Sequence, residues 1–368
     1  MRILFLTRRF HPDIGGVEKH VFEVSKELIK RGHKVTIITE SSAHGGSRNC
    51  HSIDQSDTQD INLIRPVKSS QIGNIDTRKL NVIRLNFGAE NWFKKFRIWL
   101  GVLGMLGIIR NSDIVHCHDV FFWYLPFRFL FPNKKVFTTF HGYETKFPPT
   151  ATAKFVRKIS EKLSRRNICI GKYIEKWYGT KSDFITYGGV STVQSLKSKV
   201  KNFGKNRKSM NILLLGRLEE DNGVKIYLEA LRKLKNRGIS YKLTVCGDGN
   251  YRRQFGRYGN VHGFVNNLNK YIDRADFIFA SSYLSILEAF LRSKKVFSVY
   301  QNELKRDYLT LSPFAKYVSV AGDSETLASQ VVSSISGGKV PYNKPAYFWA
   351  RKQTWSRVAD IYLKLWKL

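Results

Sequence analysis

The stretch Asp276-Phe-Ile-Phe-Ala-Ser-Ser-Tyr-Leu-Ser-Ile-Leu-Glu-Ala-Phe290, followed by Val296-Phe-Ser-Val-Tyr300, contains the pattern that decides the fold. Residues 277–280 form a short apolar run typical of a buried parallel strand, and the polar residues 281–283 end it. Residues 286–291 have apolar side chains at helical spacing, and a second apolar run begins at Val296. The stretch therefore predicts a strand–helix–strand unit whose loop follows the carboxyl end of a strand.

That loop is a candidate ligand site. Open α/β sheets bind ligands outside the carboxyl ends of their strands, and the free amides and positive end of a helix beginning there favour an anion. Glu288 is expected on the first helical turn, where a carboxylate would bind a sugar hydroxyl rather than the anion itself. The alternative is a capping box at Ser285-Ile-Leu-Glu288, in which the carboxylate binds a backbone amide. Taken alone, the stretch favours capping slightly.

Length and composition indicate a globular protein with two cores. The chain has 368 residues, 42% of them hydrophobic and 25% charged, which is too apolar for a disordered chain and long for a single core. The four cysteines are far apart and form no CxxC pair, so we expect neither a metal site nor a disulfide framework, as in a reducing cytosol. The apolar runs at residues 1–7 and 98–109 are too short for a signal peptide and a membrane span, respectively.

Net charge is the outlying property of the composition. The formal charge is +33, and such a field attracts polyanions, whether nucleic acid, anionic lipid headgroups or phosphorylated substrates. Charge alone does not choose among these partners.

The first half of the chain opens with a strand–helix–strand unit. Residues 2–7 read as a buried strand, residues 8–16 as a loop ending in Gly15-Gly16, residues 17–29 as a helix and residues 35–38 as the next strand. The fingerprint G-x-G-x-x-G is absent, so a dinucleotide site is not indicated. The paired glycines either let a loop approach a ligand closely or form a plain turn before a helix, and the sequence supports both equally.

Strands continue to alternate with helices, which predicts a parallel sheet in each half with helices on both faces. Residues 41–60 are expected to form a mobile loop, residues 224–234 a helix, and residues 191–208 a polar linker between the halves. A cleft between two such halves is a common ligand site. The further predicted strands are residues 61–64, 82–87, 113–118, 136–142, 166–170, 184–187, 211–216, 241–246 and 261–265.

One segment combines aromatic and cationic residues in a way that suits a membrane interface. In residues 91–110, Trp92, Phe93 and Phe96 are interleaved with Lys94, Lys95 and Arg97 on a predicted helix. Residues 121–131 form a second aromatic cluster that contains one arginine. The alternative is an amphipathic helix packed on the sheet, and the segment by itself favours this alternative.

Short motifs of one family occur in order along both halves. The first half has Gly15-Gly16-Val17-Glu18, Gly32-His33-Lys34-Val35, Asp113-Ile-Val-His116 with His118, and Thr139-Phe-His-Gly142. The second half has Gly216-Arg217-Leu218 with Gly223, Gly247-Asp-Gly249, Gly263-Phe264 and Ile286-Leu-Glu-Ala289. In this order and spacing the motifs resemble those of family 4 glycosyltransferases. That group retains anomeric configuration and has the GT-B fold, in which two Rossmann-like parallel-sheet domains face each other across a cleft.

The resemblance implies domains at residues 1–190 and 209–345, with a final helix at 346–368, containing Trp355 and Tyr362, packed back onto the first. It also implies a donor substrate, a UDP- or GDP-linked sugar, with no separate cofactor and no metal. Arg217 would hold the donor diphosphate, Glu288 the ribose, and His141 would lie near the reacting carbon. A fixed guanidinium and a helix N-terminus can stabilise the departing diphosphate without a metal. The remaining donor-binding positions would be Gly15, Gly16, Gly247, Gly249, Tyr283 and Leu284.

Two positions depart from the family pattern. Family members usually have a second glutamate eight residues before Glu288, where this chain has Ala280, and a lysine before Gly223, where it has Asn222. The basic residues that could compensate, unless they are solvated surface charges, are Lys225, Arg252, Lys305 and Arg306.

The functional hypothesis is a glycosyltransferase acting on a membrane-linked or anionic glycan or lipid, located in the cytoplasm and peripheral on the inner face of the cell membrane. Of the other histidines, His116 and His118 are expected to be structural, with His118 and Asp119 bordering the acceptor side. One alternative is a degenerate GT-B protein that binds a nucleotide sugar or acts as a scaffold. Another is a basic nucleic-acid-binding protein, but no recognition motif supports it, so nucleic acid is not an expected partner.

Overall fold

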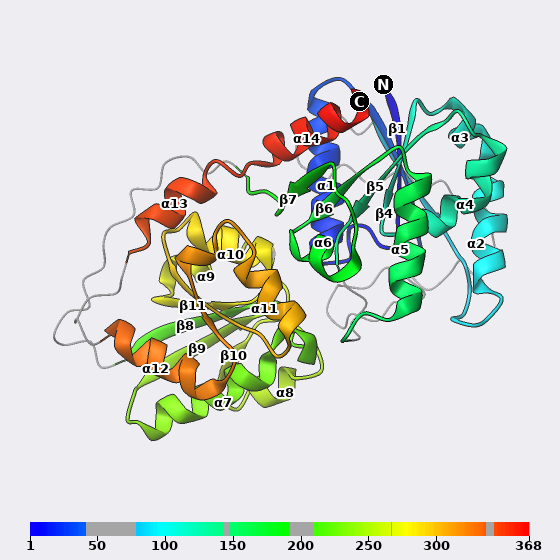
Figure 1. Cartoon of the computed structure of the whole chain (residues 1–368). Coiled ribbons are helices and arrows are strands. Elements are labelled where there is room, and N and C mark those ends of the chain that lie inside the picture. Colours follow the sequence, from blue (N-terminus) through cyan, green and yellow to red (C-terminus); the bar gives the residue numbers. More distant parts are fainter. Residues whose placement is uncertain (42–78, 143–146, 192–208, 266, 336–341, 368) are drawn as a thin grey trace, which may run out of the picture.

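The structure, a computed structural model, describes residues 1–41, 79–142, 147–191, 209–265, 267–335 and 342–367 (Figure 1). The loop expected at 41–60 falls outside the described residues except for Ser41. The strand expected at 61–64 also lies outside the described residues, as does the expected linker except for its first residue.

The first domain is built on a parallel sheet with the strand order β3-β2-β1-β4-β5-β6-β7. Its strands are β1 Arg2–Thr7, β2 Lys34–Glu40, β3 Leu80–Leu85, β4 Ile114–His118, β5 Lys135–Phe140, β6 Arg166–Ile170 and β7 Phe184–Thr186. Its helices are α1 Gly16–Lys30, α2 Lys94–Leu103, α3 Leu106–Asn111, α4 Phe121–Leu130, α5 Ala151–Leu163 and α6 Tyr173–Tyr178.

The second domain repeats this plan with the strand order β10-β9-β8-β11-β12-β13. Its strands are β8 Met210–Leu215, β9 Tyr241–Cys246, β10 Gly259–Val261, β11 Phe277–Ala280, β12 Lys295–Val299 and β13 Val318–Ala321. The helices from here to the C-terminus are η3 Glu220–Asn222, α7 Val224–Asn236, α8 Arg252–Phe255, α9 Asn269–Arg274, α10 Tyr283–Phe290, α11 Glu303–Thr310, η4 Ala315–Tyr317, α12 Ser324–Ile335, α13 Lys344–Ala350 and α14 Trp355–Lys367.

The central strands are apolar throughout because both of their faces are covered. In β11, Phe277 and Phe279 pack with α7 and α12, whereas Ile278 and Ala280 belong to the core on the other face. Every side chain of this strand is buried. The apolar run that predicted a buried parallel strand is therefore explained, since strands covered on both faces cannot alternate apolar with polar residues.

One predicted strand was placed too late in the sequence. The strand expected at residues 261–265 is β10, which ends at Val261. Gly263 has a φ of +70°, in the left-handed region, and extended strands do not use that conformation. Only an isolated bridge to Gly247 remains there.

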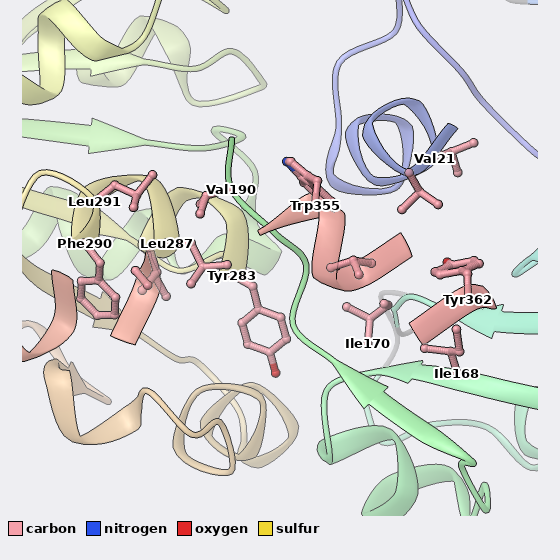
Figure 2. Close-up of a cluster of buried hydrophobic side chains, with 14 of the residues drawn as sticks. Val21, Ile168, Ile170, Val190, Tyr283, Leu287, Phe290, Leu291, Trp355 and Tyr362 are labelled. Atoms are coloured by element: carbon pink, nitrogen blue, oxygen red, sulfur yellow. The ribbon is translucent and has the colours of Figure 1, made fainter. Parts of the chain in front are cut away.

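A hydrophobic core connects the two domains through the C-terminal segment (Figure 2). It includes Leu287 and Phe290 of α10, Val21 of α1, and Trp355 and Tyr362 of α14. Helix α14 packs along α1, so the end of the chain lies against its beginning (Figure 1). The backbone amide of Trp355 also donates to the carbonyl of Val190, 3.3 Å away. The last helix therefore belongs to the first domain in space.

The strand order creates one reversal in each sheet. β1 lies between β2 and β4, and β8 lies between β9 and β11, so connections leave in opposite directions from these strands. Ligands of doubly wound sheets bind at the carboxyl ends of the strands at such a reversal. The loops that follow β1, β4, β8 and β11 are therefore the place to examine.

Candidate active site

The predicted site residues follow strands at these two reversals or directly beside them. Gly15 and Gly16 end the loop after β1, His141 follows β5, Arg217 follows β8, and Glu288 lies on the helix after β11. The carboxyl edges of the two sheets face each other, because Lys19 of α1 in the first domain donates a hydrogen bond to the Glu288 carboxylate in the second. The structure thus brings the opening glycine loop and the second-domain donor motif together.

Arg217 lies at the carboxyl end of β8 and is half exposed. Its guanidinium is held by the Asp221 carboxylate at 2.7 Å. Glu18 of the other domain is also within electrostatic reach. Burial raises the pKa of Glu18, against the opposing pull of Arg9 and Arg217. Arg217 is therefore an oriented cation between the domains, the type of group that binds a diphosphate.

Glu288 does not form the predicted capping box. Helix α10 begins at Tyr283, with Ser282 as its N-cap, so Glu288 lies in the second turn rather than the first. At that position its carboxylate cannot reach the orphan amides of the helix start, and it accepts from Lys19 instead. The expectation of a first-turn carboxylate was wrong, and the alternative of capping is removed with it.

The start of α10 is also less open than expected. The backbone amide of Tyr283 donates to the Tyr308 hydroxyl at 3.0 Å, so this amide is not free. The two rings stack with their centroids 3.9 Å apart, and the Tyr283 hydroxyl donates to the Tyr308 carbonyl at 2.6 Å. The side chain of Tyr283 is buried. Tyr283 therefore holds the loop in place with a buried ring, and its predicted donor contact stays a prediction.

The glycines of the donor motifs allow close packing of loops. At Gly15, a Cβ would collide with the Glu18 carboxylate, whereas Gly16 has open space around it. Gly247 and Gly249 lie against the loop that carries Arg217, because a Cβ at either position would meet the backbone of residues 216–218. These two glycines therefore position Arg217. Leu284 is partly buried and contacts Gly188 of the first domain.

His141 lies in a group of histidines beneath α14. Its Nε2 is 2.9 Å from Nδ1 of His118, and its ring lies edge-on to His20 with centroids 4.9 Å apart. Its backbone amide donates to the Asp119 carboxylate at 3.0 Å. Burial, reinforced by the nearby His20, His116 and Arg157, lowers the pKa of His141 well below its usual value, so the imidazole is neutral near pH 7. Such a group can accept or donate a hydrogen bond but carries no charge.

The hydrogen bonds of α14 determine the tautomer of His116. The indole N–H of Trp366 is only a donor and lies 3.1 Å from Nδ1 of His116, so Nδ1 accepts and Nε2 carries the proton. Nε2 then donates to the Thr139 hydroxyl at 2.7 Å. The Tyr362 hydroxyl joins Thr139 to His20, with both distances 2.9 Å. The expected structural role of His116 fits these contacts.

The two departures from the family pattern have local consequences. Ala280 is fully buried at the end of β11. The Asn222 side chain donates to the carbonyl of Arg217 at 3.0 Å, so it shapes the loop and supplies no charge. Of the basic residues considered as replacements, three have carboxylate partners close in sequence: Lys225 with Glu220, Arg252 with Asp248 and Arg306 with Asp307.

Sequence reasoning missed several residues of the site. Glu18 and Lys19 lie two and three residues after the paired glycines, and this proximity in sequence was the available signal for both. Tyr308 and His20 carried no such signal, because their partners Tyr283 and Tyr362 are distant in sequence.

A cavity of about 630 Å³ in the second domain is separate from this site. Its lining includes Lys242, Lys270 and Arg274 and the first halves of β8 and β9. Because the strands are parallel, it lies toward the opposite edge of the sheet from Arg217.

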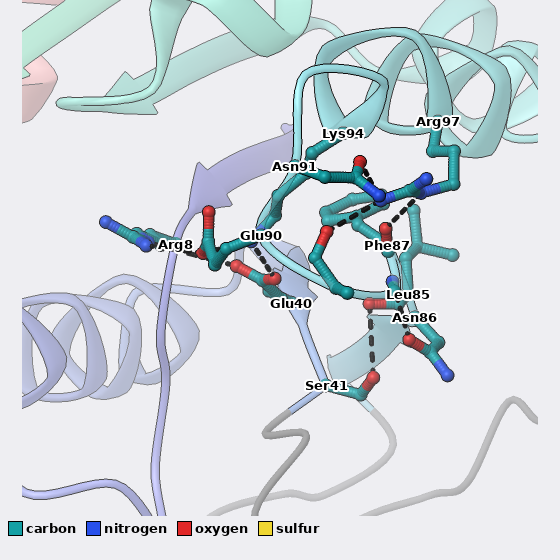
Figure 3. Close-up of polar contacts among 12 residues, drawn as sticks. Arg8, Glu40, Ser41, Leu85, Asn86, Phe87, Glu90, Asn91, Lys94 and Arg97 are labelled. Atoms are coloured by element: carbon teal, nitrogen blue, oxygen red, sulfur yellow. Dashed lines mark hydrogen bonds and ion pairs between the residues drawn. The ribbon is translucent and has the colours of Figure 1, made fainter.

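The surface of α2 corrects part of the aromatic–cationic interpretation. The segment forms two helices, α2 and α3, rather than one. Lys94 is buried between the Glu40 and Glu90 carboxylates, both at 2.5 Å, and Arg97 donates to the carbonyls of Phe87 and Ala89 (Figure 3). Lys94 is therefore internal, and Arg97 is partly buried with its guanidinium bound to the backbone.

The apolar part of the same segment is exposed. Trp92 is 76% exposed, and the other members of this exposed apolar stripe are Phe93, Phe96, Leu100 and Leu103. In the second cluster, Phe121, Trp123, Tyr124 and Phe127 are buried, whereas Phe129 and Leu130 are exposed. Across the described residues, none of the helices has both the length and the apolarity needed to cross a bilayer.

Comparisons with known proteins identify the families that the two halves of the chain resemble. The model of Glycosyltransferase Family 4 matches residues 14–184, and that of Glycosyl transferases group 1 matches residues 209–333. A phosphatidyl-myo-inositol mannosyltransferase of Mycobacterium tuberculosis is 24% identical over 264 residues, which are 70% of this chain and 63% of the relative. The chain thus spans less than two thirds of that curated relative.

Solved structures share the fold over the full chain. A glycosyltransferase from Rickettsia africae matches with a TM-score of 0.68 and 18% identity, covering 100% of this chain and 97% of the other. The Anabaena protein HepE, in complex with UDP and glucose, matches with a TM-score of 0.68 and 13% identity, covering 100% of both chains. The expected GT-B fold is confirmed, and the chain resembles family 4 glycosyltransferases in its first domain and group 1 glycosyl transferases in its second.

Proposed function

We propose that this glycosyltransferase moves a sugar from a UDP- or GDP-linked donor to a membrane-linked or anionic glycan or lipid acceptor, with retention and without a metal. The observation that carries the proposal is the meeting of Arg217 and Glu288 with the Gly15-Gly16 loop between the domains. Arg217 binds the diphosphate and Glu288 a ribose hydroxyl, while His141 borders the reacting carbon.

The chemistry of the step follows from these positions. As the nucleoside diphosphate departs, negative charge develops on its terminal phosphate oxygen. A guanidinium already oriented by Asp221 stabilises that charge with little reorganisation. Ribose binding requires Glu288 to exchange its contact with Lys19 for a sugar hydroxyl. Neutral His141 offers a hydrogen bond to the sugar without placing a charge beside the anomeric centre.

A membrane-linked acceptor is supported by the exposed apolar stripe of α2. A contiguous set of exposed aromatic and leucine side chains is typical of an interaction surface. The relative named for transfer to phosphatidyl-myo-inositol and the UDP bound to HepE support a glycolipid acceptor and a uridine donor. We therefore place the protein in the cytoplasm, bound peripherally to the inner face of the membrane.

The proposal is tested by thermal stabilisation with a panel of UDP- and GDP-sugars, followed by assays of transfer to lipid-extract acceptors. A donor at 100 times its Kd stabilises the native state by about 2.7 kcal/mol, which raises the melting temperature. Stabilisation with sugar transfer supports the enzyme. Stabilisation without transfer to any acceptor or hydrolysis supports the degenerate, donor-binding alternative, and no stabilisation by any donor contradicts the proposal.

A nucleic-acid-binding role is separated by salt titration against RNA and anionic vesicles. Contacts to nucleic-acid phosphates give a steep linear dependence of log K on log salt. Specific RNA binding that survives physiological salt, without binding to vesicles, would favour that alternative.

A further inference from the structure

Lys305 lies at the same sheet edge as Arg217. It is in the first turn of α11, the helix after β12, and β11 alone separates β12 from β8. The backbone amide of Lys305 donates a hydrogen bond to Oδ1 of Asn302 over 2.9 Å, and this contact caps the start of the helix. Arg217, the beginning of α10 and Lys305 therefore follow three adjacent strands.

The surroundings of Lys305 place it within the donor site. Its ammonium lies 5.1 Å from the centre of the Tyr308 ring, whose hydroxyl holds the first amide of α10. The charges of Arg217 and Asp221 both act on it. Burial lowers the pKa of Lys305 to about 8. The nearby Arg217 lowers this pKa further, whereas the Asp221 carboxylate raises it. This environment suits an additional anion.

The charges at the site indicate that a bound diphosphate needs a second cation besides Arg217. Arg217 already has one carboxylate partner, and Asn222 stands where family 4 has a lysine. A nucleoside diphosphate carries at least two negative charges, so one guanidinium leaves it incompletely neutralised.

We propose that Lys305 is the second cation of the donor site and binds the donor diphosphate together with Arg217, in place of the lysine absent at position 222. The inference rests on the proposed function and identifies a residue that this function did not include. A bound diphosphate stabilises the ammonium form, so binding near pH 8 is accompanied by proton uptake at Lys305. Affinity falls above pH 8 because the deprotonated amine must first be charged.

Other ionisable groups around Lys305 do not account for this dependence. Burial raises the pKa values of Tyr173, Tyr283 and Tyr308, so these hydroxyls stay neutral between pH 7 and 9. Arg217, Asp221 and the Tyr308 ring act on Lys305 directly. The ionisable groups that contact Tyr308 or the adjacent Asp307 are Tyr283 on α10, Tyr173 and Lys176 on α6, and Arg306 on α11.

The test is calorimetric binding of UDP and GDP to the full chain between pH 7 and 9. In buffers of different ionisation enthalpy, the wild-type protein should take up a proton on binding near pH 8, and its affinity should fall up to tenfold per pH unit above that. Lys305→Arg should keep most of the affinity and lose both effects. Lys305→Gln should bind at least tenfold more weakly at pH 7, and Lys235→Gln, which changes an exposed lysine near the far end of α7, should match wild type.

The outcomes separate this inference from the proposed function. If wild type binds with no proton uptake, or if Lys305→Gln keeps wild-type affinity and pH dependence while Arg217→Ala loses binding, Lys305 is not the second cation and the donor site stands. If wild type binds neither nucleotide, the donor site itself is wrong and the role of Lys305 falls with it. The uptake measurement uses wild-type protein, so it decides the matter even if a variant fails to fold.

Discussion

Arg217 and Glu288 show how single residues acquire their roles from partners in the other domain. Asp221 orients Arg217, and Glu18 interacts with it electrostatically. The Glu288 carboxylate accepts a hydrogen bond from Lys19. Both charges are thus compensated in the ligand-free protein, and donor binding exchanges these partners for phosphate and ribose.

Replacement of Arg217 with Ala should weaken UDP or GDP binding about 10- to 100-fold, because a hydrogen bond to a charged group contributes about 1.5–3 kcal/mol. Isothermal titration calorimetry measures the change. Arg232→Ala is the control, since this exposed arginine pairs with Glu229 on α7. Unchanged nucleotide affinity in Arg217→Ala would exclude the phosphate role.

Replacement of Glu288 with Ala should reduce nucleotide affinity while lowering the free energy of unfolding by less than about 1 kcal/mol, as expected for a partly exposed ion pair. Lys19→Ala is the matched control, because it breaks the same pair but keeps the carboxylate. Equal losses of nucleotide affinity in the two variants would show that binding depends on the ion pair itself and not on a contact between Glu288 and the ribose. Affinity and stability are measured by calorimetry and urea unfolding.

At the scale of elements, α2 presents an apolar stripe and Lys95 to solvent, while Lys94 is buried between carboxylates and Arg97 is partly buried against backbone carbonyls. This division follows from the helical period, which separates residues 92, 93, 96, 100 and 103 from the buried face at 94, 98 and 102.

Replacing Trp92, Phe93 and Phe96 with Ser should weaken binding to anionic vesicles at every salt concentration, because apolar burial is not screened by salt. Lys95→Gln should instead reduce the salt dependence, since each cation near an anionic surface contributes about 1 kcal/mol that screening removes. Vesicle co-sedimentation measures both effects. Failure of wild type to sediment at low salt, or unfolding of the aromatic variant, would rule out docking.

Helix α14 contributes hydrogen bonds to the first domain through Tyr362. Tyr362→Phe leaves buried His20 and Thr139 without a shared partner, so the free energy of unfolding should fall by about 1–3 kcal/mol. Asp360→Asn on the same helix breaks an exposed pair with Arg31 and should change it by at most about 1 kcal/mol. Equal effects in urea unfolding would contradict a structural role for the buried network.

At the scale of the whole molecule, four neutral histidines link pH to stability. Burial lowers the pKa of His20 to about 3 and lowers the pKa values of His116, His118 and His141 well below their usual value. Their unfolded pKa is about 6.5. Below this value the unfolded chain binds protons that the native protein does not, which favours unfolding.

The free energy of unfolding should therefore be insensitive to these groups above pH 7 and should fall as the pH decreases from 6.5 toward 4. Each histidine can contribute up to about 1.4 kcal/mol per pH unit. Urea unfolding at pH 4.5 to 7.5 measures the slope, and His262→Gln, a change at an exposed histidine, should preserve it. A flat profile over this range would contradict the buried, neutral state of the cluster.

The sequence by itself determined the alternation of strands and helices and the edge at which the site lies. The run at 277–280 predicted β11 because a strand covered on both faces must be apolar throughout, and this pattern is local. Local patterns also predicted β1 and α1, and the paired glycines lie where the loop after β1 meets α1, at the edge of the sheet. The motifs also identified Arg217, Glu288 and His141 as candidates, although their roles in binding and catalysis stay predictions.

Only the tertiary structure decided which charged and polar groups meet. Glu288 pairs with Lys19, which is 269 residues away, and this contact replaced the local capping box that the sequence favoured. Lys94 was expected at a membrane surface but lies between Glu40 and Glu90, and Tyr283 proved to be buried against Tyr308. The physical reason is that secondary structure follows local periodicity, whereas side-chain partners depend on strand order and on how the two domains pack, which no short stretch encodes.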